Sequence, residues 1–259
     1  MLNANYKTML SFFCAVFGSL IGSLCTASPI AIPPTSSWHW QLSGTLQYPN
    51  RHVYDIDLYD TPTSTIANLK AQGRIVVCYF SAGGWEDWRD DAALYPQSAL
   101  GNNLSGWPGE RWLDIRNAEV RALLAQRLDL AASKGCHAVE PDNIDGYSND
   151  NGLGLTEADQ VAFNRWLADQ AHERQLAIAL KNAVELIPQL VNHFDFALNE
   201  SCYRYNECGG YSAFTAQGKA VFIAEYRKYS SNLCSKAAKS GYQLQFFKRA
   251  LTSVGQPCQ

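Results

Sequence analysis

Residues 136–150 read CHAVEPDNIDGYSND, a short apolar run that ends in a cluster of acidic and amide side chains. The run carries Glu140 inside it, breaks at a proline and continues into Asp142, Asn143 and Asp145. Successive side chains of a strand point to opposite faces, so Glu140 and Asp142 share one face. We therefore expect a buried strand whose carboxyl end presents carboxylates to a site.

This strand belongs to a repeating pattern of short apolar strands and helices. The expected strands are residues 53–60, 74–80, 111–117, 136–143, 176–182, 195–200, 219–226 and 242–249. Eight strands with intervening helices, in about 200 residues, predict an α/β chain folded as a single (β/α)8 TIM barrel. A doubly wound open sheet would alternate in the same way, but no G-x-G-x-x-G sequence follows the first strand, which favours the barrel.

Three local signals refine this prediction. WHWQL (38–42) is expected to be an extra segment that leads into the barrel. Asn117 precedes apolar residues at helical spacing and is expected to cap the helix that follows it. Thr156 and Asp159 have the spacing of a capping box and predict the start of a second long helix.

Composition limits the class of protein and of ligand. The chain has 259 residues, of which 47% are apolar and 17% charged, as in a compact globular protein. The formal net charge is −3, which argues against a polyanion such as nucleic acid as the partner. A neutral or cationic ligand fits this charge better.

The amino-terminal residues differ from the rest of the chain. Residues 9–25 are apolar and carry no charge, and Ala27 offers a small side chain at a cleavage point. Residues 1–27 therefore predict a secretory signal peptide, with an uncleaved membrane anchor as the alternative. We expect a secreted or extracellular protein with no membrane span after cleavage. Residues 28–37 are expected to form a Pro/Ser-rich tether and residues 38–259 a monomeric barrel domain.

Six cysteines follow the predicted signal peptide: Cys78, Cys136, Cys202, Cys208, Cys234 and Cys258. An even number in an exported chain indicates disulfides. We expect the short-range pairs Cys202–Cys208 and Cys234–Cys258, with Cys78 and Cys136 either paired or buried. A zinc site would need C-x-x-C spacings, which the sequence lacks, so we expect neither a metal nor a cofactor.

Charged side chains recur at the ends of the predicted strands. They are Asp55 and Asp57 in the first strand, Asp142 in the fourth, Lys181 in the fifth, Glu200 in the sixth and Glu225 in the seventh. The carboxyl ends of barrel strands build the active site of this fold. Asp142 and Glu200 are the best-placed pair for glycosidic bond cleavage, which needs one acid to protonate the leaving oxygen and another to attack or to activate water. Taken alone, Asp142 could also be an ordinary turn residue.

Aromatic residues near the strand ends favour a sugar ligand, because flat sugar faces stack on aromatic rings. The candidates for substrate contact are Trp40, Asp55, Asp57, Tyr79, Glu86, Asp145, Tyr147, Lys181 and Glu225. The excess of acids would attract a cationic sugar such as an amino sugar. The sequence contains no G-x-S-x-G elbow and no Walker loop, and its histidines lack metal-binding spacing.

Several motifs carry a resemblance to a known family. They are WHWQLSG (38–44), VYDIDLYDT (53–61), VVCYFSAGGWEDWR (76–89), GWPGERWLDIR (106–116), CHAVEPDNIDGY (136–147), ALKN (179–182), DFALNESC (195–202) and GKAVFIAEY (218–226). In this order and spacing the chain resembles glycoside hydrolase family 114, the endo-α-1,4-polygalactosaminidases. His137 is a departure, because relatives commonly carry an acid there.

The resemblance implies a (β/α)8 hydrolase that cuts α-1,4-linked galactosamine in galactosaminogalactan-type polysaccharides, with Asp142 and Glu200 as the catalytic acids. By analogy with α-galactosidase barrels, Asp142 would be the nucleophile and Glu200 the acid/base of a retaining mechanism. Two alternatives stay open: a glycosidase for another α-galactoside or an N-acetylgalactosaminide, and a non-catalytic polysaccharide-binding barrel. A glycan on the Asn199 sequon would crowd this site, so we expect Asn199 to be unmodified.

Overall fold

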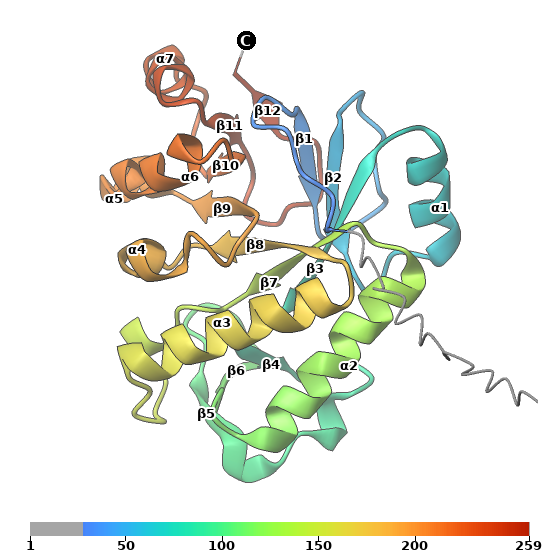
Figure 1. Ribbon diagram of the computed structural model, residues 1–259, viewed down its shortest axis with the longest axis vertical. Helices are drawn as coiled ribbons and strands as arrows, with labels where there is room; N and C mark the ends of the chain where they lie inside the picture. The colour runs from blue at the N-terminus through green and yellow to red at the C-terminus, as the bar shows by residue number, and fades with distance from the viewer. Residues whose placement is uncertain (1–27, 259) are drawn as a thin grey trace, which may run out of the picture.

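The computed structural model describes residues 28–258, and the predicted signal peptide lies outside them. Within this range, eight parallel strands form a curled sheet that one short antiparallel strand extends (Figure 1). In sheet order they are β1 (Trp38–Gln41), β2 (Val53–Asp57), β3 (Ile75–Ser81), β7 (Ala138–Asp142), β8 (Ala177–Lys181), β9 (Phe196–Glu200), β10 (Val221–Glu225), β11 (Gln243–Phe246) and the antiparallel β12 (Gln256–Pro257).

Helices surround the curled sheet on its outer side (Figure 1). They are α1 (Thr63–Ala71), α2 (Ala118–Lys134), α3 (Glu157–Glu173), α4 (Ile187–Leu190), α5 (Cys202–Tyr205), α6 (Ser212–Ala216) and α7 (Ser231–Ser240). Short 3-10 helices lie at Ala92–Leu94, Gln97–Ala99, Gly146–Ser148, Val184–Leu186 and Cys208–Tyr211. None of the helices in the described range is both long and apolar enough to cross a membrane.

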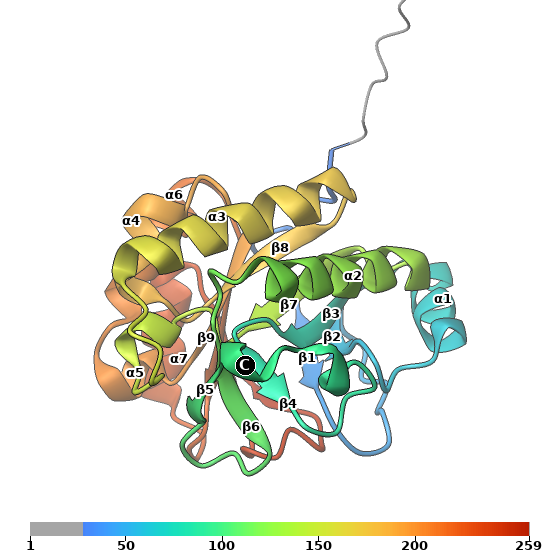
Figure 2. The ribbon, with the colours of Figure 1, turned by 90° about the horizontal axis from the view of Figure 1, so that it is seen from below.

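Two strand predictions were wrong, but together they leave the number of parallel strands in the sheet at eight. The stretch expected to be the third barrel strand contains β6 (Glu110–Leu113), which pairs instead with β4 (Gly84–Glu86) and β5 (Leu100–Asn103) in a small antiparallel sheet. The segment expected to lead into the barrel is the parallel strand β1. We call residues 82–113, which carry the small sheet, the arm. Figure 2 shows the strands of the arm grouped apart from the curled sheet.

The two edges of the curled sheet are joined by side chains. Trp38 Nε1 donates to the carbonyl oxygen of Gln243 at 3.0 Å, and Gln245 Nε2 donates to the carbonyl oxygen of Trp38 at 2.5 Å. Within residues 28–258, no backbone pairing connects β1 to β11. The α/β class and the curled parallel sheet are thus confirmed, whereas a fully closed (β/α)8 barrel stays a prediction.

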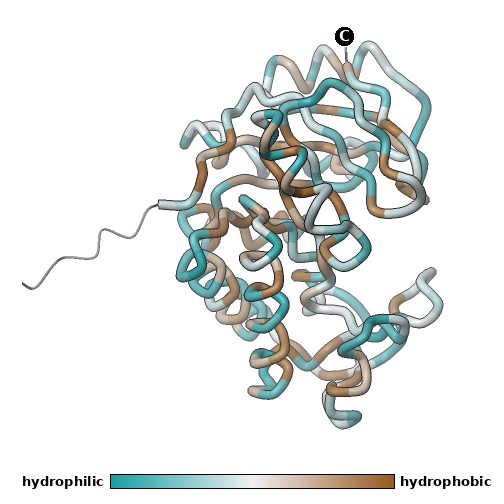
Figure 3. Tube along the Cα trace, turned by 90° about the vertical axis from the view of Figure 1, so that its right-hand side faces the viewer, coloured by the Kyte–Doolittle hydropathy of each residue, from teal (hydrophilic) through white to brown (hydrophobic). Residues whose placement is uncertain are grey.

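The strands are buried on both faces, because their side chains alternate between two apolar clusters. One cluster lies between the sheet and the helices and includes Ile56, Val76, Val139, Ile178 and Ile223. The other fills the inside of the curled sheet and includes Trp38, Val77, Ala138, Ala179 and Phe222. Figure 3 shows apolar stretches along the central part of the chain and hydrophilic ones at many outer turns. Buried carboxylates interrupt the apolar faces at Asp55 and Glu140, in the middle of β2 and β7.

The predicted tether is partly folded into the domain. Ile32 is buried among the inner cluster, and the buried Ser36 bonds through its hydroxyl to His52 Nδ1 at 3.0 Å. The description of residues 28–37 as a mere tether therefore needs correction, because an isoleucine in this segment completes the core.

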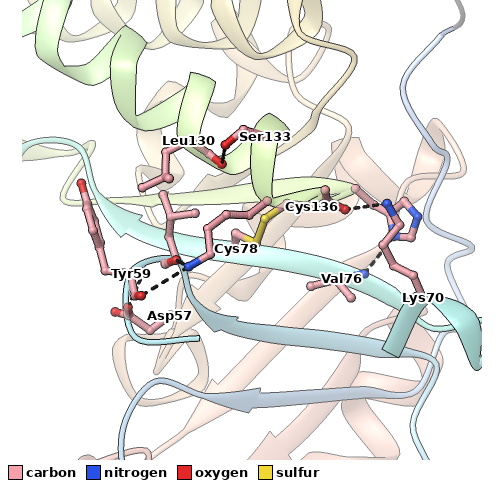
Figure 4. Close-up of a disulfide and its surroundings, with 12 residues drawn as sticks. Asp57, Tyr59, Lys70, Val76, Cys78, Leu130, Ser133 and Cys136 are labelled. Carbon is pink, nitrogen blue, oxygen red and sulfur yellow. Dashed lines mark hydrogen bonds between the residues drawn. A yellow bond between two sulfur atoms is a disulfide. The ribbon is translucent and has the colours of Figure 1, made fainter. Parts of the chain in front are cut away.

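The helix caps and disulfides agree with the sequence. Asn117 caps α2, and Thr156 with Asp159 forms a capping box on α3. Disulfides join Cys78–Cys136, Cys202–Cys208 and Cys234–Cys258 in the described part of the chain, so both short-range pairs are confirmed. Figure 4 shows the Cys78–Cys136 bond between β3 and the residues that precede β7, beside Leu130 and Ser133 of α2.

Candidate active site

Three neighbouring parallel strands end in side chains that meet at one point. Lys181, at the end of β8, places its Nζ 3.1 Å from Asp142 Oδ1 and 3.2 Å from Glu200 Oε2. Because one nitrogen contacts both carboxylates, Asp142 Oδ1 and Glu200 Oε2 can be at most about 6.3 Å apart. β7 and β9 flank β8 in the sheet, so strand order alone sets this opposition.

The chain turns sharply directly after each of these three residues. Asn143, Asn182 and Ser201 follow them and have φ values of 61°, 49° and 71°, in the left-handed region. Asparagine tolerates this region, whereas a serine there costs about 1–2 kcal/mol. Strained positions of this kind cluster at functional sites, where the surrounding structure holds them.

Tyrosines orient the two opposed carboxylates. Tyr79 donates its hydroxyl to Asp142 Oδ2 at 3.1 Å, and Tyr226 donates its hydroxyl to Glu200 Oε1. Burial raises the pKa of both tyrosines, and the neighbouring carboxylates raise it further. Both hydroxyls therefore stay protonated and serve as donors, which fixes the direction in which each carboxylate faces.

A second layer of buried polar groups lies beneath this pair. Glu140 is fully buried and accepts from Lys181 Nζ at 2.8 Å and from Trp40 Nε1 at 2.9 Å. Burial raises the pKa of Glu140 to about 7. Burial and the charge of Glu140 also raise the pKa of the adjacent Asp55 well above its usual range. Asp55 and Glu140 therefore share one proton, so these two acids together carry one negative charge next to Lys181.

A cavity of about 710 Å³ opens over these residues. The curled sheet contributes Asp142, Lys181 and Glu200 to its wall, and the arm contributes Glu86, Trp88 and Glu110. A space of this size suits a ligand larger than one sugar ring. The arm, which the sequence pattern misplaced in the sheet, thus forms the opposite side of the site.

Most of the predicted site residues meet at this cavity. Its lining includes Trp40, Asp57, Tyr79, Glu86, Asp142, Asp145, Lys181 and Glu200. Asp145 is half-buried, and burial together with the charge of Asp142 raises its pKa to about 7.

The cavity lining does not include Asp55, Tyr147 or Glu225. Asp55 lies in the layer beneath. The backbone nitrogen of Tyr147 donates to Gln160 of α3, and Glu225 accepts from the backbone nitrogen of Tyr203 at 2.9 Å. Asp55 and Glu225 thus have partners within the fold, and the Tyr147 ring packs against the outer apolar cluster rather than lining the cavity.

Two of the predicted substrate contacts, Asp57 and Glu86, form ion pairs with an arginine. Arg89 bonds to Asp57 at 2.7 Å and to Glu86 at 3.0 Å, and Arg127 bonds to Asp91 at 2.8 Å. We call these five side chains the guanidinium network. Since Asp57 belongs to β2, Arg89 and Asp91 to the arm and Arg127 to α2, the network holds the arm against the sheet.

Sequence reasoning missed several residues at the cavity: Trp88, Trp107, Glu110, Asn182, Tyr226 and Arg249. Tyr226 directly follows β10 and is the last residue of the expected strand 219–226. The acid- and tryptophan-rich stretches 85–89 and 107–112 were the available signal for the arm. Their role was hidden because the second stretch was assigned to a barrel strand.

The sequon at Asn199 points inward. Asn199 is only 1% exposed, donates to Asn182 Oδ1 at 3.2 Å and accepts from the backbone nitrogen of Cys202 at 2.7 Å. This burial supports the prediction that Asn199 carries no glycan, which peptide mapping of protein from a glycosylating host would test.

The fold and the site together define a class of protein. Opposed carboxylates at the carboxyl edge of a curled parallel sheet, inside an acidic cavity with aromatic walls, are features of a glycoside hydrolase. The model of glycoside-hydrolase family GH114 matches residues 23–259, and the chain belongs to this family. The predicted enzyme class and family are therefore confirmed.

Solved structures agree with this assignment. The chain is 39% identical to Ega3 of Aspergillus fumigatus, solved in complex with galactosamine, with a TM-score of 0.85 over 90% of this chain and 99% of that one. The glycoside hydrolase domain of PelA from Pseudomonas aeruginosa is 16% identical, with a TM-score of 0.67 over 85% of this chain and 97% of that one, which shows a shared fold. A comparison with curated proteins gives no match.

Proposed function

We propose that this protein is an exported endo-α-1,4-polygalactosaminidase that cleaves galactosamine-containing polysaccharide. The opposition of Asp142 and Glu200 around Lys181 is the observation that carries the proposal. The galactosamine bound to the similar Ega3 structure supports the choice of sugar. Three disulfides in the described chain and the predicted signal peptide support export, since such bonds persist in oxidising compartments.

The reaction would proceed with retention of configuration. Glu200, as the acid, gives its proton to the glycosidic oxygen while Asp142 attacks the anomeric carbon, so the leaving chain departs as an alcohol and a glycosyl ester forms. Glu200 then takes a proton from water, whose oxygen displaces Asp142. Retaining enzymes place their carboxyls about 5–5.5 Å apart and inverting ones about 6.5–9.5 Å apart. Because Asp142 Oδ1 and Glu200 Oε2 lie 3.1 Å and 3.2 Å from one nitrogen, their separation stays below the inverting range, which supports retention.

Lys181 has a supporting role in this mechanism. Its ammonium group is buried, with a side chain that is only 1% exposed, and it contacts both catalytic carboxylates from below. Its positive charge offsets the negative charge that gathers where Asp142 and Glu200 meet. Trp40 and Tyr79, whose rings lie 4.9 Å and 5.8 Å from Nζ, hold the lysine in place. We also infer that the curled sheet closes as a (β/α)8 barrel, which the Trp38 and Gln245 hydrogen bonds support.

The decisive experiment is incubation of the purified mature chain with deacetylated galactosaminogalactan, with the released oligomers identified by mass spectrometry. The proposal expects a ladder of galactosamine oligomers. Cleavage of only acetylated or other α-galactoside polymers would favour the alternative glycosidase. Binding without new reducing ends would favour the non-catalytic barrel. Proton NMR of the first product formed reports retention or inversion.

A further inference from the structure

Two tryptophans of the arm are exposed at the cavity. Trp88 and Trp107 are each 53% exposed and both line it. Their segments are tied together because the backbone nitrogen of Asp87 donates to the carbonyl oxygen of Gly109 at 3.0 Å. A Cβ at Gly109 would lie 3.0 Å from the Trp88 ring, so that ring lies over a glycine with a φ of +90°. The glycine allows the indole to lie against the backbone with its other face free.

Two carboxylates adjoin these rings. Glu86 of β4 and Glu110 of β6 are direct register partners, and both line the cavity. Glu86 is 3% exposed and binds Arg89 through one oxygen, and its other oxygen has no hydrogen bond in the described chain but lies 3.7 Å from Arg127 Nη1. The half-buried carboxylate of Glu110 has neither a hydrogen bond nor an ion pair to any residue of the described range. Within the described range, Glu110 therefore lacks a cation, whereas its strand partner Glu86 has Arg89.

One kind of ligand would supply both a cation for the carboxylate and a flat apolar face for the exposed rings. A carboxylate pair binds an ammonium group, and an indole face stacks on a sugar ring. We propose that Glu110 and Glu86, with Trp88 and Trp107, form a second amino-sugar subsite on the arm, which binds a galactosamine unit away from the bond that is cut. This inference rests on the proposed function, because both need a galactosamine polymer in the cavity.

Electrostatics supports the assignment. Burial and the charge of Glu86 raise the pKa of Glu110 to about 7, and the charge of Asp142 adds to this rise. A carboxylate in this situation gains most from a bound cation, because the cation offsets both effects. By contrast, Asp57 and Asp91 of the guanidinium network each bind an arginine at 2.7–2.8 Å, so the same ligand would gain little from them.

Kinetics on galactosamine oligomers of defined length would test the subsite. Glu110→Gln should raise KM about tenfold on long deacetylated oligomers, with kcat changed by less than about twofold, because uniform binding is lost. Trp88→Ala and Trp107→Ala should raise KM in the same way. On oligomers too short to reach the arm, all three variants should match the wild type. Salt should raise the KM of the wild type more than that of Glu110→Gln.

Matched controls are available on the surface. Glu119 is exposed on α2, and Tyr48 is 64% exposed, and neither lines the cavity, so Glu119→Gln and Tyr48→Ala should behave as the wild type. An unchanged KM for Glu110→Gln on long oligomers would overturn the subsite. An equal rise on short and long oligomers would also overturn it, because the effect would then be at the catalytic centre. If the wild type cleaves no galactosamine oligomer, the proposed function fails instead, and calorimetric binding of the same oligomers decides the subsite.

Discussion

Two acidic clusters face the same cavity and differ in how their charges are balanced. In the guanidinium network, three carboxylates share two arginines, with bonds of 2.7–3.0 Å. Around Lys181, three carboxylates share one ammonium group at 2.8–3.2 Å, and Asp55 lies behind them. The first cluster has nearly enough cations of its own, whereas the second is short of positive charge.

This difference separates a structural role from a functional one. Bidentate arginine–carboxylate pairs fix geometry and satisfy buried charge, so the network serves to hold the arm. A cluster with surplus carboxylates leaves a negative potential in the cavity, and together with burial it raises the pKa of Glu140 and Asp55, a kind of shift that is frequent at functional sites. A sequence shows both clusters merely as acids at strand ends.

The largest effect should follow from removing either opposed acid. Asp142→Asn and Glu200→Gln should each lower hydrolysis of galactosamine polymer by about 10³-fold or more, because each removes an essential acid or nucleophile. Their side chains are 19% and 27% exposed, so the thermal transition should change little. Asp60, exposed at the same cavity, offers a matched control, and Asp60→Asn should keep wild-type turnover. Ordinary turnover in either acid variant would refute its role.

Removing the single cation should damage both stability and activity. Lys181→Met leaves Glu140 buried without its partner, and breaking a buried pair in this way costs about 3–5 kcal/mol. For a domain of this size we expect the melting temperature to fall by on the order of 10 °C. The loss should be greater at pH 8 than at pH 5, because protonating the buried Glu140 costs more free energy as the pH rises.

A double variant separates the two effects of Lys181. Lys181→Met with Glu140→Gln removes the buried charge, so it should recover most of the lost stability in a thermal melt. Hydrolysis should stay low, because Asp142 and Glu200 still lack the ammonium group between them. Recovery of activity together with stability would mean that Lys181 has only a structural role.

The guanidinium network should respond in the opposite way. Asp57→Asn weakens the pair with Arg89 but keeps an oxygen that can accept from the backbone nitrogens of Tyr59 and Asp60. We expect a loss of about 1–3 kcal/mol in the free energy of unfolding, measured by urea titration. The kcat/KM per folded molecule should change by less than about threefold. A large rise in KM with unchanged stability would instead restore Asp57 as a substrate contact.

The sequence predicted that Asp142, Lys181 and Glu200 lie at one edge of the sheet because the signal for each of them is local. Asp142, Lys181 and Glu200 each end an apolar strand of about five residues, and the fold brings the carboxyl ends of neighbouring strands together. The disulfides Cys202–Cys208 and Cys234–Cys258 were predictable because they close short loops. Helix starts at Asn117 and Thr156 were likewise legible from a few adjacent residues.

The arm was not predictable in the same way, because its structure depends on distant partners. Residues 111–113 fall within the stretch that was expected to be a barrel strand, but β6 pairs antiparallel with β4 and β5. Conversely, β1 has only four residues and becomes a sheet strand by pairing with β2. Glu110 gained significance only when its register placed it opposite Glu86. Strand pairing is a non-local choice, and a single sequence does not record it.

The smallest expected effect is the pH dependence of stability that Glu110 causes. Most surface acids stabilise the fold as pH rises, whereas Glu110 should destabilise it. Its pKa is raised from 4.5 to about 7 by burial, Glu86 and Asp142, with Arg89 acting the other way. Between these two pH values the unfolded chain has released the proton that the folded one still holds. Ionisation therefore destabilises the fold progressively as pH rises through this window. Glu110→Gln removes the penalty, so its melting temperature relative to the wild type should increase by a few degrees from pH 4.5 to pH 7.5 and then level off.

Glu119→Gln, on the exposed face of α2, is the control, and its melting temperature relative to the wild type should not change with pH. A flat difference for Glu110→Gln as well would mean that Glu110 already has a cation partner in solution, and its contrast with the guanidinium network would disappear.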